Sequence, residues 1–185
     1  MNDWHLRQAV RVLRNGGIIA YPTEAVWGLG CDPFNSAAVQ RLLEIKRRPE
    51  YKGLILAAAS EEQIEPLLVH LSDQQRAQLS ETWPGPNTWL LPDTEQLIPR
   101  WIKGQHSGVA VRVSAHPIVR ALCEAFGAPL VSTSANVSSA PPAKSKTKVR
   151  AYFGSGVDFI VDGALGGLDR PTTIRNLSDN SVVRT

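Results

Sequence analysis

The sequence lacks several features that would exclude or assign whole classes of protein. Its only two cysteines, Cys31 and Cys123, have neither a metal-ligand nor a redox spacing, so we expect two reduced, buried, small apolar side chains. No apolar run approaches the roughly 20 residues that cross a bilayer, and the polar first residues lack a signal-peptide core. These absences predict a cytoplasmic protein that makes no membrane contact.

Familiar catalytic motifs are also absent. The chain has no GxxxxGK[ST] phosphate loop, no GxGxxG at the start of a helix, no HExxH and no GxSxG. The four histidines are scattered without ligand spacing, so we predict no protein metal site: His5, His70, His106 and His116. Any bound nucleotide must therefore be held by other groups than a standard phosphate loop.

The composition that is present describes an ordinary globular chain. Hydrophobic residues make up 43% and charged residues 20% of the 185 positions, enough for one substantial core, so we predict a single domain over residues 1–185. The net charge of +3 suits an anionic ligand or an encounter with RNA and establishes neither.

Helical and strand patterns alternate along the chain. Helical spacing of apolar residues predicts helices over 3–15, from Ser36 to Lys46 and after His116-Pro117, and capping-box patterns predict others at Ser60 and Ser72. Buried strands are predicted at 18–21, 53–59, 88–91, 109–113 and 130–133, with short ones at 159–161, 173–174 and 182–183. Residues 22–33 are predicted as a loop, and 138–148 as a mobile surface loop. The alternation indicates an α/β protein with one twisted open sheet flanked by helices, with functional loops at strand ends.

A basic cluster lies at the end of the second predicted helix. Four cations fall within seven positions: Lys46, Arg47, Arg48 and Lys52. The cluster is either a clamp for a polyanion or a solvated helix C-terminus, where cations meet the helix dipole favourably. Lys46 favours the clamp slightly, because it continues the apolar stripe of the helix and should point inward.

Polar side chains follow two of the predicted strands. Ser132, Thr133, Ser134 and Asn136 come at the end of one, and Tyr21-Pro22-Thr23-Glu24 at the end of another. Such clusters line ligand crevices in open sheets, although the cluster after residues 130–133, taken alone, is more typical of a polar turn that caps the next element. Two of them make a site at this edge of the sheet more credible than one.

Five ordered motifs then identify a family. They are Tyr-Pro-Thr-Glu with Gly-Leu-Gly at 21–30, Lys-x-Arg-Pro at 46–49, Pro-Gly-Pro-x-Thr at 84–88, Val-Ala-Val-Arg-Val at 109–113 and Ser-Ala-Asn at 134–136. In this set the chain resembles the YrdC/Sua5 family of threonylcarbamoyl-adenylate synthases, in its short bacterial form, over nearly the whole length. The resemblance implies an open α/β sheet with a basic concave face.

The resemblance also implies two groups of site residues. Those around ATP are Lys46, Arg48, Ser134 and Asn136, which also carry catalysis, together with Arg184 near the end of the chain. Lys52 is added to this group, although many members of the family have Asn-Pro where this chain has Lys52-Gly53. Those around the threonine substrate are Thr23, Arg112, Ser132, Thr172 and Thr173, with Arg112 paired to the carboxylate.

The reaction implied by the resemblance joins L-threonine, bicarbonate and ATP into threonylcarbamoyl-adenylate, with release of pyrophosphate. Mg²⁺ is expected as a cofactor bound with ATP. The adenylate serves a threonylcarbamoyl transferase complex that makes N6-threonylcarbamoyladenosine in tRNA, so a contact with RNA or tRNA is also expected.

Two other functions fit some of the same residues. The cations would serve a double-stranded RNA-binding module that acts in ribosomal RNA maturation, but such a module needs no pocket. The second alternative function is carbamoyl transfer to another acceptor, because related domains occur in hydrogenase-maturation carbamoyltransferases. The acylphosphatase-like and zinc-finger segments that accompany those domains are missing here.

Overall fold

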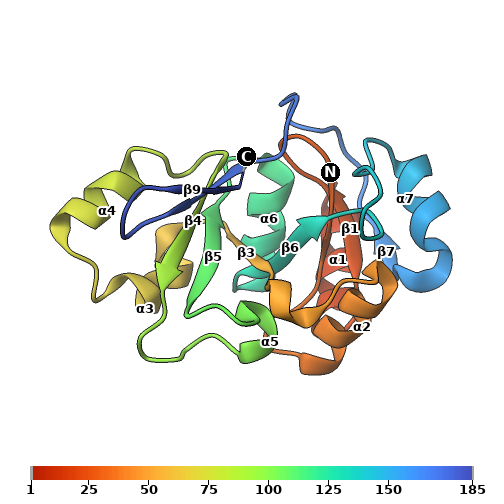
Figure 1. Cartoon of the computed structure of the whole chain (residues 1–185). Coiled ribbons are helices and arrows are strands. Elements are labelled where there is room, and N and C mark those ends of the chain that lie inside the picture. Colours follow the sequence, from red (N-terminus) through yellow and green to blue (C-terminus); the bar gives the residue numbers. More distant parts are fainter. Residues whose placement is uncertain (1, 185) are drawn as a thin grey trace.

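The computed structural model describes residues 2–184, with only the backbone of Arg184, and has helices around one large sheet (Figure 1). The α-helices are α1 (Asp3–Arg14), α2 (Ser36–Lys46), α3 (Glu65–Leu68), α4 (Asp73–Ser80), α5 (Arg100–Lys103), α6 (Pro117–Phe126) and α7 (Lys146–Phe153). Short 3-10 helices are η1 (Glu50–Lys52), η2 (Glu61–Ile64) and η3 (Gly154–Gly156).

The sheet contains nine strands within the described residues. They are β1 (Ile19–Pro22), β2 (Trp27–Gly30), β3 (Ile55–Ala58), β4 (Asn87–Pro92), β5 (Gly108–Val113), β6 (Leu130–Ser134), β7 (Phe159–Ile160), β8 (Thr173–Asn176) and β9 (Val182–Arg184). Their order is β7-β1-β2-β6-β3-β5-β4-β8-β9. The pairs β1–β7, β3–β5 and β4–β8 are parallel and the others antiparallel, which confirms the predicted α/β class and its open sheet.

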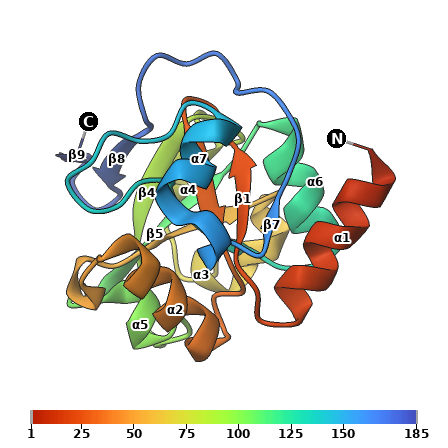
Figure 2. The same ribbon diagram turned by 90° about the vertical axis from the view of Figure 1, so that its right-hand side faces the viewer.

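Alternation along the strands divides the core into two layers. On one face, Ile19, Tyr21 and Leu130 pack with α1 and α6, which lie side by side in Figure 2. On the other face, the alternate residues of the same strands pack with the apolar stripe of α2 and with residues of α3 and α4. Successive strand residues point to opposite faces, so this pattern fixes the register of each strand.

The face covered by α1 and α6 is left open farther along the same strands. Ile55 of β3 lies beside Ala110 of β5 and Ser132 of β6. The next pair on the same face, Ala57 and Leu130, belongs to the core that α1 and α6 cover. Small residues here leave room above the sheet, because side chains of one parity share one face. The uncovered part of this face becomes the floor of a cavity.

Three details differ from the sequence prediction. Residues 27–30, predicted as loop, form β2, because Gly28 and Gly30 allow Tyr21 and the β6 backbone to approach closely. Ser60 makes no side-chain cap, and a 3-10 turn precedes α3, whereas the predicted capping box at Ser72 is confirmed.

The third difference concerns the predicted loop at 138–148. Its last three residues belong to α7, and Ala143 is fully buried, with its backbone bonded to Trp27 and Ala135. The segment is thus anchored to the sheet at its middle, because these two backbone bonds extend the β2–β6 pairing.

Both cysteines are buried and free, as predicted, and burial raises the pKa of each thiol to about 12. Within residues 2–184, no helix has the length and apolar character needed to cross a membrane.

Candidate functional site

A cavity of about 820 Å³ lies over the open part of the sheet face. Residues of seven neighbouring strands, from β2 to β9 in the order of the sheet, line it, and the loop before β3 and the β1–β2 turn form part of its walls. Among the described lining residues, four are cations and one is an anion: Arg48, Lys52, Lys103, Arg112 and Glu24. This excess of positive charge favours an anionic ligand.

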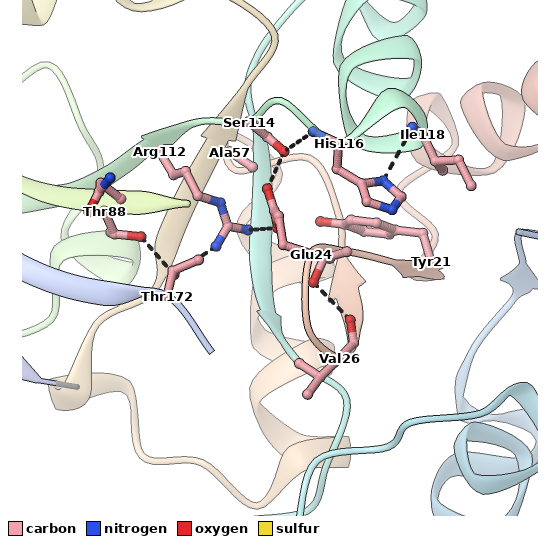
Figure 3. A network of polar contacts seen from close by, with 12 residues as sticks. Tyr21, Glu24, Val26, Ala57, Thr88, Arg112, Ser114, His116, Ile118 and Thr172 are labelled. Atoms are coloured by element: carbon pink, nitrogen blue, oxygen red, sulfur yellow. Dashed lines mark hydrogen bonds and ion pairs between the residues drawn. The ribbon is translucent and has the colours of Figure 1, made fainter. Parts of the chain in front are cut away.

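One end of the cavity holds a buried network of charges and hydroxyls, which we call the buried end (Figure 3). Arg112 of β5 donates through Nη1 to Thr172 Oγ1 at 2.9 Å, and its Nη2 lies 3.6 Å from Glu24 Oε2. The Oγ1 atoms of Thr172 and Thr88 are 3.1 Å apart. Three segments distant in sequence thus meet around one guanidinium, whose fork suits a carboxylate ligand.

The carboxylate of Glu24 is fixed from its other side. Ser114 Oγ donates to Glu24 Oε1 at 2.6 Å and accepts the amide hydrogen of His116 at 3.1 Å (Figure 3). His116 Nδ1 accepts from the amide of Ile118, and Nε2 lies 3.2 Å from the carbonyl oxygen of Ala164, so Nε2 carries the hydrogen. Burial lowers the pKa of His116, which keeps the ring neutral in this role.

The opposite end of the cavity, which we call the exposed end, is formed by the loop between α2 and β3. Arg48 donates to the carbonyl oxygen of Gly53 at 2.8 Å, and Lys52 is exposed. Tyr51, 52% exposed, adds an aromatic ring to the same wall. A cationic rim of this kind is suited to phosphates that remain partly in water.

Lys46 lies under this rim rather than in it. As predicted from the helical stripe, its side chain points inward and is only 3% exposed. Its Nζ donates to the carbonyl oxygens of Ser134 and Asn136, the latter at 2.9 Å. Burial, and secondarily the Arg48 cation, lower the pKa of Lys46 to about 7.

The turn after β6 is held by its own side chains as well as by Lys46. Ser134 Oγ donates to Asn136 Oδ1 at 2.6 Å, and Asn136 Nδ2 donates to the carbonyl oxygens of Val137 and Ala140. The amide of Ser138 donates to the carbonyl oxygen of Lys46 at 2.8 Å. Together these bonds fix the backbone that borders the cavity.

The structure brings most of the predicted site residues to one cavity. Seven of them line it: Thr23, Arg48, Lys52, Arg112, Ser132, Ser134 and Thr172. Lys46 and Asn136 stand behind the wall, where they shape the turn, and Thr173 is a strand residue of β8 outside the lining. The side chain of Arg184 lies outside the described residues.

Four polar residues of the network were not among the predicted site residues: Glu24, Thr88, Ser114 and His116. Glu24 belongs to a motif that was identified, but its partners Arg112 and Ser114 lie almost half the chain length away in sequence. Thr88 is fully buried against Thr172, 84 positions later. A carboxylate beside the apolar Ala25-Val26-Trp27 run is the one sequence signal that could have marked Glu24 as partnered, since buried carboxylates need partners.

The fold and site define a class of protein: an open α/β sheet that carries a ligand cavity with an excess of cations. Comparison with known families agrees with this class. Residues 11–185 match the model of the Sua5/YciO/YrdC family, whose description is telomere recombination. The chain belongs to this family.

Particular relatives match over almost their whole length. The threonylcarbamoyl-AMP synthase of Chromohalobacter salexigens is 55% identical over 179 residues, which cover 97% of this chain and 96% of the relative. That of Stutzerimonas stutzeri is 52% identical over 184 residues, which cover 100% and 98%.

Solved structures share the fold. P. abyssi Sua5 complexed with L-threonine superposes with a TM-score of 0.90 and 34% identity, over 98% of this chain and 53% of that chain. E. coli YciO gives a TM-score of 0.83 at 28% identity, over 99% and 89%.

Proposed function

We propose that this chain is a threonylcarbamoyl-AMP synthase, which makes L-threonylcarbamoyl-adenylate and pyrophosphate from L-threonine, bicarbonate and ATP. The observation that carries the proposal is one cavity with a buried guanidinium at one end and a cationic rim at the other. An amino acid and a nucleotide can meet there over the sheet. Relatives that bear this enzyme's name are 50–58% identical to the chain.

The buried end receives threonine in this proposal. Arg112 takes the carboxylate, which the reaction leaves free, and Thr172 and Thr88 hold the guanidinium in place. Thr23 is less available than its position predicts, because its Oγ1 donates to the carbonyl oxygen of Val26 at 2.8 Å. Ser132, buried on the cavity floor beside Ile55, remains a candidate for the substrate hydroxyl.

The exposed end receives the triphosphate. The amine of threonine and bicarbonate form a carbamate, one oxygen of which attacks the α-phosphorus while pyrophosphate leaves. Arg48 and Lys52 face the phosphates, and the fixed turn at Ser134 and Asn136 offers polar groups beside them. No covalent enzyme nucleophile is required, since positioning and charge stabilisation carry phosphoryl and nucleotidyl chemistry of this kind.

Magnesium enters the proposal with the nucleotide. Glu24 is the single carboxylate among the described lining residues, and Ser114 and Arg112 already engage it. The walls therefore do not fit a carboxylate cage, and the phosphates and water must supply the ligands of the ion. Bound in that way, magnesium neutralises charge on the phosphates.

The product would be consumed by the transferase complex that modifies tRNA. An RNA-binding module would explain the cations but not the buried network at the other end of the cavity. The two are separated by measuring pyrophosphate release from ATP with threonine and bicarbonate each present or omitted. Release that requires both supports the synthase, and release that requires neither contradicts it.

A further inference from the structure

The buried end carries a negative side chain that the proposed reaction does not use. The side chains of Glu24 and Arg112 are only 9% and 7% exposed. Glu24 Oε1 accepts from Ser114, but Glu24 Oε2 is buried and accepts no hydrogen bond among the described residues. Buried carboxylate oxygens are normally satisfied, so this one calls for an explanation in terms of the ligand.

The two charges are held apart instead of closing into a bidentate pair. Ser114 holds the carboxylate and Thr172 holds the guanidinium, which leaves 3.6 Å between Oε2 and Nη2. Arg112 Nε is also buried, and no other residue in the described part of the chain accepts a hydrogen bond from it. A tight pair would use up both groups, whereas this one leaves a positive and a negative charge side by side in the cavity wall.

Such a wall discriminates between ligands by charge. A simple carboxylate on Arg112 would lie a few ångströms from Glu24 and be repelled by it. A ligand with a cation next to its carboxylate escapes this penalty, and an α-amino acid in its zwitterionic form has that arrangement. The other charged lining residues described are cations, so Glu24 alone supplies an attraction for an ammonium group.

We propose that Glu24 is a specificity-determining residue, which makes the buried end select the zwitterion of the amino acid over carboxylates that lack an amino group. This inference rests on the proposed function, because it takes threonine as the substrate. Glu24 acts by its charge beside Arg112, and Ser114 keeps that charge in place.

The same charge changes its effect once the carbamate forms. The ammonium group gives one proton to solvent, its nitrogen bonds to the carbon of bicarbonate, and a second nitrogen proton leaves with the hydroxyl of bicarbonate as water. The nitrogen has then lost its positive charge and carries an anionic carboxylate. Glu24 repels that anion and the cations at the exposed end attract it, so the carbamate is directed toward the nucleotide.

The test compares two ligands that differ only in the amino group. The affinities of L-threonine and (R)-3-hydroxybutyrate are measured by calorimetry, without ATP and in bicarbonate-depleted buffer, for the wild type and Glu24→Gln. The wild type should prefer threonine by about tenfold or more, the factor of a single favourable charge contact. Glu24→Gln keeps an acceptor for Ser114 and should bring this ratio close to one, chiefly by a gain in (R)-3-hydroxybutyrate affinity, because the repulsion of its carboxylate is removed.

Two further variants control the result. Glu24→Asp keeps the charge and should retain much of the preference, and Glu81→Gln removes an exposed charge outside the cavity and should change nothing. Equal loss of both ligands in Glu24→Gln would indicate a merely structural residue and overturn the inference. Equal binding of both ligands by the wild type would overturn it even if Glu24→Gln fails to fold. Failure of the wild type to bind threonine at all would instead overturn the proposed substrate.

Discussion

The two ends of the cavity hold their charges in different ways. At the buried end, Glu24 and Arg112 are buried, and the hydroxyls of Ser114 and Thr172 fix their positions. At the exposed end, Lys52 lies exposed on a short 3-10 turn, and Arg48 donates to the backbone carbonyl oxygens of Lys52 and Gly53. The difference matches the two proposed ligands. A small amino acid needs a prearranged pocket such as the buried end, whereas a triphosphate carries enough charge to bind the less rigid exposed end.

The largest effect on stability is expected from replacing Arg112 at the buried end. Arg112→Ala leaves Glu24 as an unpaired buried charge, which should lower the free energy of unfolding by about 3–5 kcal/mol. The double variant Glu24→Gln with Arg112→Gln should recover much of that loss, because no charge is then left alone. Urea unfolding measures both. If the loss in the double variant equals the sum of the losses in the two single variants, the two side chains do not act as a pair.

A smaller effect is expected at the exposed end, and on activity more than on stability. Arg48→Ala should reduce pyrophosphate release by the equivalent of about 1.5–3 kcal/mol in the transition state, since in the proposed site Arg48 makes a charged contact to phosphate. Its unfolding midpoint should change little, because the side chain is partly exposed. Near-wild-type turnover would remove Arg48 from the phosphate site.

Lys46 sharpens the comparison, because it joins the exposed end to the interior. Its lowered pKa of about 7 means that the unfolded chain binds more protons than the folded one between that pH and the ordinary value of 10.5. The stability of the wild type relative to Lys46→Met should therefore rise with pH from 7 to 9, by up to about 1.4 kcal/mol per pH unit. A pH-independent difference in urea midpoints would mean that Lys46 stays charged in the fold.

The smallest effect is expected from the far end of the buried network. Thr88→Val keeps the shape and removes one hydroxyl beside Thr172, which should cost about 0.5–1.5 kcal/mol of stability. The KM for threonine should rise modestly, with the KM for ATP unchanged. Steady-state kinetics with each substrate varied provides the check, and a change confined to ATP would contradict this placement of Thr88.

How far the sequence predicted this molecule depends on the range of each interaction. Helical periodicity alone predicted that Lys46 points inward, and short apolar runs predicted β5 and β6, because both signals are local. The strand β2 was missed because Gly-Trp-rich segments of this kind are typical of loops, and only the approach of β1 and β6 makes it a strand. The role of Glu24 was out of reach, since its hydroxyl partner is 90 positions away.

The origin of one carbon atom tests the central claim most directly. The protein is incubated with ATP, magnesium, threonine and carbon-labelled bicarbonate, and the nucleotides are separated quickly, before a mixed anhydride hydrolyses. The proposed synthase predicts label in a species that contains both threonine and AMP, at one labelled carbon per AMP. An AMP adduct that forms without label, or forms equally well in carbonate-depleted buffer, would contradict it.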